Sequence, residues 1–270
     1  IIAASIAAVV AAPAAFADLK ISGQITAEIA DVDNAGDIAM TEASDVVFSG
    51  SEDLGNGMKA FFKIASSPDV TSTNSGMIGE DDRYIGLSAD FGTITLGRFE
   101  ELTSSKVTDM AHGLASSEVL DIENKPASAG NRGNEGVRYV SPNFNGVSVA
   151  VEGFMDGDSD QSTETDDFDS TSYMIQYSNA GLTVRYAAQN NEDADEDSSH
   201  IGVSYKMGDL TVAVADTDSD AAGEDVTIVG GKYTMGANSV AAAFVASSGD
   251  STEEGDFIVK ATHSLSKSTS

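Results

Sequence analysis

Apolar and polar residues alternate along short stretches of this chain, and turns rich in Gly, Asn and Asp separate the stretches. In residues 19–29, one face of an extended segment would carry apolar side chains and the opposite face polar ones. The apolar set is Leu19, Ile21, Ile25, Ala27 and Ile29, and the polar set is Lys20, Ser22, Gln24, Thr26 and Glu28. This period of two residues fits both a soluble two-sheet sandwich and a membrane barrel with a water-filled lumen.

The same alternation predicts fourteen strands, which places the chain in the all-β class. Their expected bounds are 19–30, 45–52, 57–65, 83–89, 92–99, 135–141, 146–155, 171–178, 181–189, 199–206, 209–216, 225–234, 238–246 and 256–264. Short turns and long loops alternate between these strands, and the longest loop covers residues 100–134. So long a loop is uncommon in a compact soluble domain, whereas outer-membrane barrels have short turns at one end and long loops at the other. The connections therefore favour a barrel, with loop 100–134 folded into its lumen.

Several Lys and Arg residues lie inside the predicted strands, where they alternate with large apolar residues. Lys59 and Lys63, for example, alternate with Met58, Phe62 and Ile64. A Lys or Arg is rarely buried in a soluble core without an acidic partner, but it costs little on the wall of a water-filled lumen. We therefore expect these cations to face a lumen and the apolar set to face lipid. The alternative is a two-sheet sandwich with the cations on its solvent face.

The chain is strongly acidic: its 270 residues include 44 Asp and Glu against 14 Lys and Arg, a formal net charge of −30 at pH 7. A nucleic-acid-binding protein needs a basic surface, so nucleic acid is excluded as a partner. Most of the acidic residues lie in the long loops rather than in the strands or short turns. The chain has no Cys, which removes disulfides, thiolate metal ligands and Cys nucleophiles together.

Residues 1–17 differ in composition from the rest of the chain: they are almost entirely apolar and end in Ala15-Phe16-Ala17. A short apolar stretch before an A-x-A pattern is typical of a secretory signal peptide, and this one is too short to span a membrane as a helix. Because Met and a basic segment do not precede it, we expect the sequence to start within the signal. We therefore divide the chain into a signal peptide, residues 1–17, and one exported domain, residues 18–270.

Three predicted hairpins resemble hairpins of the Gram-negative general porins, in the same order along the chain. Their sequences are GSEDLGNGMKAFFKI at 50–64, RYIGLSADFGTITLGR at 83–98 and VRYVSPNFNGVSVAVE at 137–152. The recurring pairs of strands extend the resemblance over residues 18–270.

The resemblance implies a transmembrane antiparallel β-barrel with sixteen strands in the full protein, about fourteen of them in this chain, so that the last hairpin would be missing. It also implies a homotrimer that contacts lipid and lipopolysaccharide in the outer membrane of a Gram-negative bacterium. The expected function is passive diffusion of ions and small hydrophilic solutes through a channel that the loop near 100–134 narrows.

The resemblance further assigns residues to the narrowest part of the channel, the constriction. The basic candidates on its wall are Arg98 and Arg138, which match the basic cluster of the family, together with Lys59 and Lys63. The acidic candidates on the loop are Glu118, Asp121 and Glu123. Gln24 and Asp45 stand near positions where the family often carries a cation, so we expect a mild preference for cations.

No cofactor, metal site or catalytic group is predicted. Residues 156–160 resemble the start of a calcium-binding loop, but the Gly required at the sixth position is replaced by Gln161. His112, His200 and His263 lack the spacing of a zinc site. Two alternatives to a porin remain open: a secreted acidic β-sandwich or adhesin-like binding protein, and an outer-membrane barrel hydrolase, although the chain has no G-x-S-x-G motif.

Overall fold

The computed structural model describes residues 18–31, 38–67, 81–115, 132–155, 168–191, 196–220, 225–248 and 254–264. The strands are β1 (Lys20–Asp31), β2 (Ile38–Gly55), β3 (Met58–Ser66), β4 (Arg83–Ala89), β5 (Gly92–Glu100), β6 (Arg132–Val140), β7 (Val147–Phe154), β8 (Ser170–Asn179), β9 (Leu182–Asn191), β10 (Glu196–Met207), β11 (Leu210–Ser219), β12 (Asp225–Met235), β13 (Asn238–Ser248) and β14 (Glu254–His263). Three short helices, α1 (Ser104–Val107), η3 (Thr108–Met110) and η4 (His112–Leu114), follow β5.

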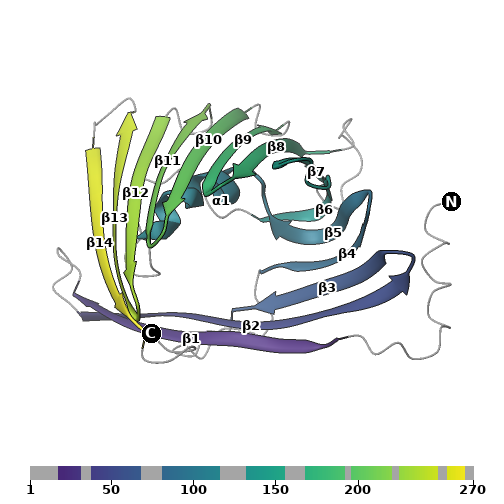
Figure 1. Cartoon of the computed structure of the whole chain (residues 1–270), viewed down its shortest axis with the longest axis horizontal. Coiled ribbons are helices and arrows are strands. Elements are labelled where there is room, and N and C mark those ends of the chain that lie inside the picture. The colour runs from purple at the N-terminus through teal and green to yellow at the C-terminus, as the bar shows by residue number, and fades with distance from the viewer. Residues whose placement is uncertain are drawn as a thin grey trace, which may run out of the picture.

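The strands form one antiparallel sheet in which the order in space is the order in sequence, from β1 to β14. The sheet curves around α1 (Figure 1). Each predicted strand is present, and the largest difference is at β2, which begins at Ile38 instead of residue 45. Residues of this extension pair with the second half of β1, from Ile25↔Ser44 to Asp31↔Ile38. Hydrogen bonding along the hairpin thus carries the strands beyond the alternating sequence pattern.

Large apolar side chains are exposed on the face of the sheet turned away from α1. Ile64, Phe257 and Val259 are 47%, 66% and 57% exposed, whereas Lys63 and Arg138, on the opposite face, contact groups inside the curve. One curved sheet with an uncovered apolar face is the arrangement of a transmembrane barrel. The two-sheet sandwich is wrong, because no second sheet covers this face in the described residues.

Within the described ranges, no helix has the length and apolar character needed to cross a membrane.

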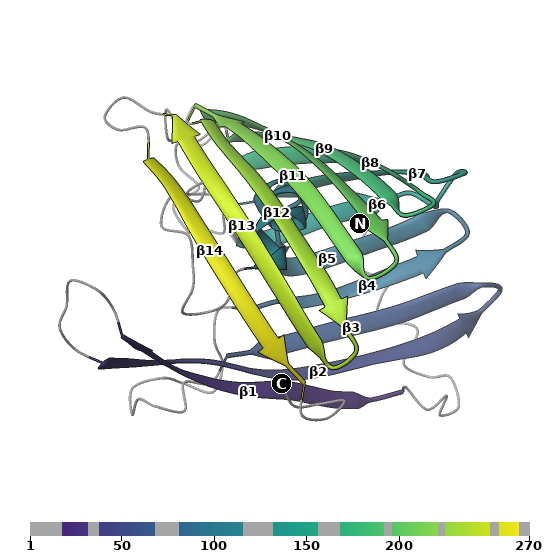
Figure 2. The same cartoon turned by 60° about the vertical axis from the view of Figure 1, so that its left-hand side comes forward.

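The sheet has two edges, β1 and β14, in the described part of the chain. Both can be followed in Figure 2. The expected sixteen strands of the full protein and the missing last hairpin stay predictions. The predicted signal peptide, residues 1–17, lies outside the described residues.

The short turns use the residue types that the sequence indicated. Asn56 and Gly57, between β2 and β3, have φ angles of 53° and 77°. Asn145 and Gly146, before β7, have φ angles of 53° and 95°. Positive φ is favourable for Gly and tolerated by Asn. These residue types therefore suit the tight turns that join β2 to β3 and β6 to β7.

Residues 101–115, which we call the inner segment, lie against the inner face of β9–β13. Ala111 and Ala115 are fully buried, and Leu114 packs beside them on the wall. The wall side of this contact consists of Ala213, Ala215, Val226, Ile228, Ala241, Ala243, Val245 and Ile258. The apolar core of the protein is therefore this contact inside the curve, formed where a strip of wall carries small apolar residues instead of polar ones.

Candidate functional site

The inner segment leaves the sheet at a buried carboxylate, Glu152 of β7. The Leu102 backbone N–H donates to Glu152 Oε1 at 2.7 Å, and Ser172 Oγ donates to the same oxygen at 2.6 Å. Arg138 Nε donates to Glu152 Oε2 at 2.6 Å. Arg138 and Glu152 are direct cross-strand partners in β6 and β7. The register of the β6–β7 hairpin thus places Arg138 beside Glu152. The Glu152 carboxylate in turn accepts from the start of the inner segment.

Arg138 is fixed by two further contacts. Its Nη2 donates to the backbone carbonyl oxygen of Glu100, and its guanidinium carbon lies 4.2 Å from the centroid of the Phe99 ring. A cation over an aromatic face is attracted by the ring quadrupole. Arg138 therefore has a single well-supported position on the wall.

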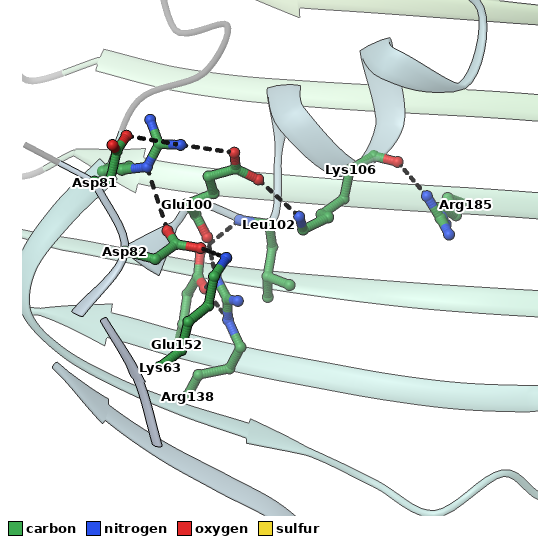
Figure 3. Close-up of polar contacts among 10 residues, drawn as sticks. Lys63, Asp81, Asp82, Glu100, Leu102, Lys106, Arg138, Glu152 and Arg185 are labelled. Carbon is green, nitrogen blue, oxygen red and sulfur yellow. Dashed lines mark hydrogen bonds and ion pairs between the residues drawn. The ribbon is translucent and has the colours of Figure 1, made fainter. Parts of the chain in front are cut away.

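Charged side chains from distant parts of the chain meet in a set that we call the lumen charge network (Figure 3). Lys63 Nζ lies 2.7 Å from Asp82 Oδ2, and Arg132 Nε lies 3.2 Å from Asp82 Oδ1. Arg132 Nη2 lies 3.1 Å from Glu100 Oε1, and Lys106 Nζ lies 2.9 Å from Glu100 Oε2. Lys106 belongs to the inner segment, so the network joins this segment to the facing wall.

The network lines a cavity of about 460 Å³. Its charged lining residues are Asp45, Asp81, Asp82, Glu100, Lys63, Lys106, Arg132 and Arg138. Phe61, Tyr84 and Phe99 also line it. The Tyr84 ring packs edge to face against both others, with centroids 6.3 Å from that of Phe61 and 6.5 Å from that of Phe99. Acidic and basic residues are equal in number on this lining, so the cavity is strongly polar without a large excess of either sign.

Two polar side chains of β9, Arg185 and Gln189, hold the beginning of the inner segment. Arg185 Nη1 donates to the Lys106 backbone carbonyl oxygen at 2.5 Å, which satisfies an acceptor at the end of α1. Gln189 accepts a hydrogen bond from Thr103 Oγ1 at 3.1 Å and donates one to Glu101 Oε2 at 3.1 Å. The segment is thus tied to the wall through backbone and side-chain groups together.

A buried row of polar groups supports the middle of the inner segment. Thr108 Oγ1 lies 3.4 Å from Thr217 Oγ1 of β11, and Thr217 Oγ1 lies 3.0 Å from His200 Nδ1 of β10. All three residues are nearly inaccessible to solvent. His200, isolated in the sequence, is therefore part of the wall behind the segment and does not face the cavity of the network.

Two carboxyl groups outside the strands have shifted pKa values of opposite sign. Burial raises the pKa of Asp82, but the hydrogen bond and charge of Lys63, with the charge of Arg132, outweigh burial and hold this pKa below its ordinary value. Burial also raises the pKa of Glu101; the hydrogen bond from Gln189 opposes this rise and the nearby charge of Glu152 adds to it, so this pKa lies above its ordinary value. Asp82 therefore stabilises the fold at neutral pH and loses this effect in acid, whereas Glu101 is destabilising when ionised.

Acidification from pH 7 to about pH 4 is expected to protonate Glu101 before Asp82. Any preference of the lumen for cations should weaken in the mildly acidic range, because one negative charge beside the network is lost first. Reversal potentials across a salt gradient, recorded at a series of pH values, measure this step. The Glu101→Gln variant should lack the mildly acidic step and keep the later one, and an unchanged profile in this variant would contradict the assignment.

The structure brings two of the four basic candidates into the site, Lys63 and Arg138. Lys59 lies on the same face of β3 as Phe61 and Lys63. It is nearer the short turn, where its side chain is exposed. Arg98 lies outside the network: its Nη1 donates to the Arg132 carbonyl oxygen at 3.2 Å and to Asn134 Oδ1 at 2.6 Å. The acidic candidates, Glu118, Asp121 and Glu123, lie outside the described residues. The roles of all these residues at a constriction stay predictions.

The sequence did not single out several members of the site. These are Asp82, Glu100, Lys106, Arg132 and Glu152. Glu152 carried a usable signal, since it is an acid inside a predicted strand whose hairpin partner is Arg138. The others lie at strand ends or in the long loop. Charged residues are common there, and the alternation does not indicate which face of the sheet a side chain occupies.

Comparisons with known proteins bear on the family and the fold of this chain. A family model described as Gram-negative porin matches residues 3–270. The chain is 30% identical over 190 residues to the major outer membrane protein P.IB of Neisseria lactamica, which covers 64% of this chain and 54% of that protein. It is 35% identical over 109 residues to P.IB of Neisseria meningitidis serogroup A. This match covers 40% of this chain and 32% of that protein. The chain thus spans about half the length of the curated relatives it matches.

The fold of this chain is also similar to solved porin structures. An anion-selective porin from Comamonas acidovorans gives a TM-score of 0.65 at 19% identity, over 92% of this chain and 86% of that one. OmpF of Salmonella typhi, solved in complex with daunomycin, gives 0.68 at 15% identity, over 92% and 86%. At these identities the likeness concerns the fold.

Proposed function

Because this chain belongs to the Gram-negative porin family, whose members are outer-membrane channels, we propose that it forms a water-filled channel through the outer membrane for passive diffusion of ions and small hydrophilic solutes. One observation carries this proposal: the sheet exposes large apolar side chains on one face and encloses paired charges on the other. Lipid suits the first face and water suits the second. The inner segment would then form one side of the constriction.

The passage would select solutes by size and polarity. In the described residues, the lumen charges pair with one another on the inner face of the sheet, and such paired groups orient water and polar solutes instead of retaining one ligand. This arrangement suits diffusion more than catalysis, since no nucleophile is held against a general base within the network.

A mild preference for cations is part of the proposal. The cavity lining has equal numbers of acidic and basic residues. Two further buried carboxylates lie next to lining residues: Glu152 accepts from Arg138, and Glu101 follows Glu100 in the chain. Most of the remaining acids lie in the long loops. Charges beyond about 8 Å are largely screened at about 0.15 M salt, so the network should dominate at that salt concentration and the loops should contribute mainly in dilute salt.

The proposed partners are other copies of this chain in a homotrimer, together with outer-membrane lipid and lipopolysaccharide. The family and the exposed apolar face support them. Chemical crosslinking of the protein in native outer membranes, followed by gel electrophoresis, tests the trimer: three-copy adducts support it, and single-copy bands alone contradict it.

Electrical recording tests the channel itself. Protein folded into planar lipid bilayers should produce stepwise increases of conductance, and liposomes containing it should swell in small sugars but not in large ones. Heat-unfolded protein is the control. Folded protein that leaves the bilayer insulating and the liposomes closed would contradict the proposed function.

A further inference from the structure

The wall behind the inner segment contains two glycines, Gly202 of β10 and Gly230 of β12. Both pair regularly with residues of β11: Gly202 lies opposite Ala215, and Gly230 lies opposite Ala213. Neither has a positive φ, so the backbone conformation does not require glycine at these positions. A glycine inside a strand weakens the strand and often marks a place where another backbone approaches closely.

That close approach is visible at Gly230. A Cβ atom there would lie 2.4 Å from the backbone carbonyl oxygen of Ala111, and an ordinary contact begins near 3.4 Å. Ala111 is fully buried in the apolar core, so its backbone has no free space on the wall side. The carbonyl would have to move away from the wall by about 1 Å.

Gly202 meets the preceding turn of the same segment. A Cβ atom there would lie 2.9 Å from Met110 Sδ, 3.0 Å from Val107 Cγ1 and 3.1 Å from the Val107 carbonyl oxygen. The nearest of these atoms is in a flexible side chain, which can shift at low cost. Substitution at Gly202 should therefore displace the segment less than substitution at Gly230.

We propose that Gly202 and Gly230 set the width of the channel, because they let the backbone of residues 107–111 lie directly on the wall. This inference rests on the proposed channel function and adds residues that line no part of the charged cavity. A side chain at either position would move the segment toward the opposite wall, where Lys63 and Arg132 stand. Tight packing transmits such a displacement, since protein interiors do not compress to absorb it.

The adjacent residue Gly231 provides a matched control. It lies in the same strand on the opposite face, and a Cβ atom there would have as nearest neighbours the Thr211 carbonyl oxygen at 3.8 Å and Val212 Cγ1 at 3.9 Å. Gly231→Ala makes the same chemical change and the same change in strand propensity as Gly230→Ala, but leaves the inner segment in place.

The test is the single-channel conductance of full-chain variants in planar bilayers, with a liposome-swelling series of sugars of increasing size. Because conductance follows the open cross-section, we expect Gly230→Ala to lose roughly 10–30% of it and to exclude the larger sugars. Gly202→Ala should show a smaller loss, and Gly231→Ala should match the unmodified protein.

Equal conductance in Gly230→Ala and Gly231→Ala would overturn the inference, as would a larger conductance in Gly230→Ala, which would mean that the segment detaches. If Gly230→Ala does not fold, judged by its circular dichroism, the comparison of Gly202→Ala with Gly231→Ala decides in the same way. An unmodified protein that forms no channel would instead overturn the proposed function on which the inference rests.

Discussion

Replacing Glu152 by Ala is expected to lower the free energy of unfolding by about 3–5 kcal/mol, the cost of breaking a buried ion pair by removing one partner. Glu152 is 5% exposed and accepts from Arg138, Ser172 and the Leu102 N–H. Its loss would leave a buried guanidinium and a backbone donor without this acceptor. Urea titration of the protein folded in lipid vesicles measures the stability change, and excess noise in single-channel recordings would report the loosened inner segment.

The conservative variant Glu152→Gln separates the two parts of this effect. An amide oxygen can still accept from the Leu102 N–H, but it carries no charge for Arg138, so channel noise should recover more than stability does. Asp218→Ala is the matched control, since it removes a carboxylate from the exposed face of β11. Equal stability of Glu152→Ala and Asp218→Ala would show that the pair does not hold the inner segment.

The strands could be predicted from the sequence because two-residue alternation has one physical cause along the whole chain. A sheet between lipid and water imposes that period wherever the strand crosses the apolar layer. Toward the long loops the period fades, but backbone pairing continues, as in the extension of β2 from residue 45 to Ile38. Strand ends near the long loops are therefore the part that a sequence pattern leaves open.

The charged site could be predicted only in part. Lys63 and Arg138 lie within strands, so alternation fixes the face they occupy. Lys106, by contrast, reaches Glu100 only because the inner segment folds back onto β9–β13, and that docking depends on the small apolar residues of a distant wall. Contacts between segments far apart in the chain have no signal in the local pattern.

Arg98 lies outside the lumen charge network, although the resemblance assigns it to the basic wall. The resemblance placed it on the basic wall, but along β5 it shares the alternation of Ile94 and Leu96, which are exposed apolar residues. Phe99 is buried under Arg138, and Arg98 lies beside Asn134, next to a register shift between Gly97 and Phe99. The position of the Arg98 side chain thus follows the strand period, and its expected role at a constriction stays a prediction.

Replacing Lys106 by Ala is expected to increase the preference of the channel for cations several-fold. Lys106 is the basic residue that the inner segment contributes to the cavity, and its side chain is 38% exposed there. Without it, Glu100 keeps Arg132 as its ionic partner and the lining carries one net negative charge. A unit charge about 4 Å from a passing ion is worth about 1 kcal/mol even in bulk water, roughly a fivefold change in local ion density.

Reversal potentials across a potassium chloride gradient measure the permeability ratio directly. Arg98→Ser is the matched control: it removes the same charge from a side chain that bonds to the Arg132 carbonyl oxygen and Asn134, outside the cavity lining. We expect this control to change the ratio less, because Arg98 does not line the cavity. If the two variants shift the reversal potential equally, the selectivity does not arise at the lumen charge network. If Lys106→Ala turns the channel toward anions, the network does not face the permeating ions at all.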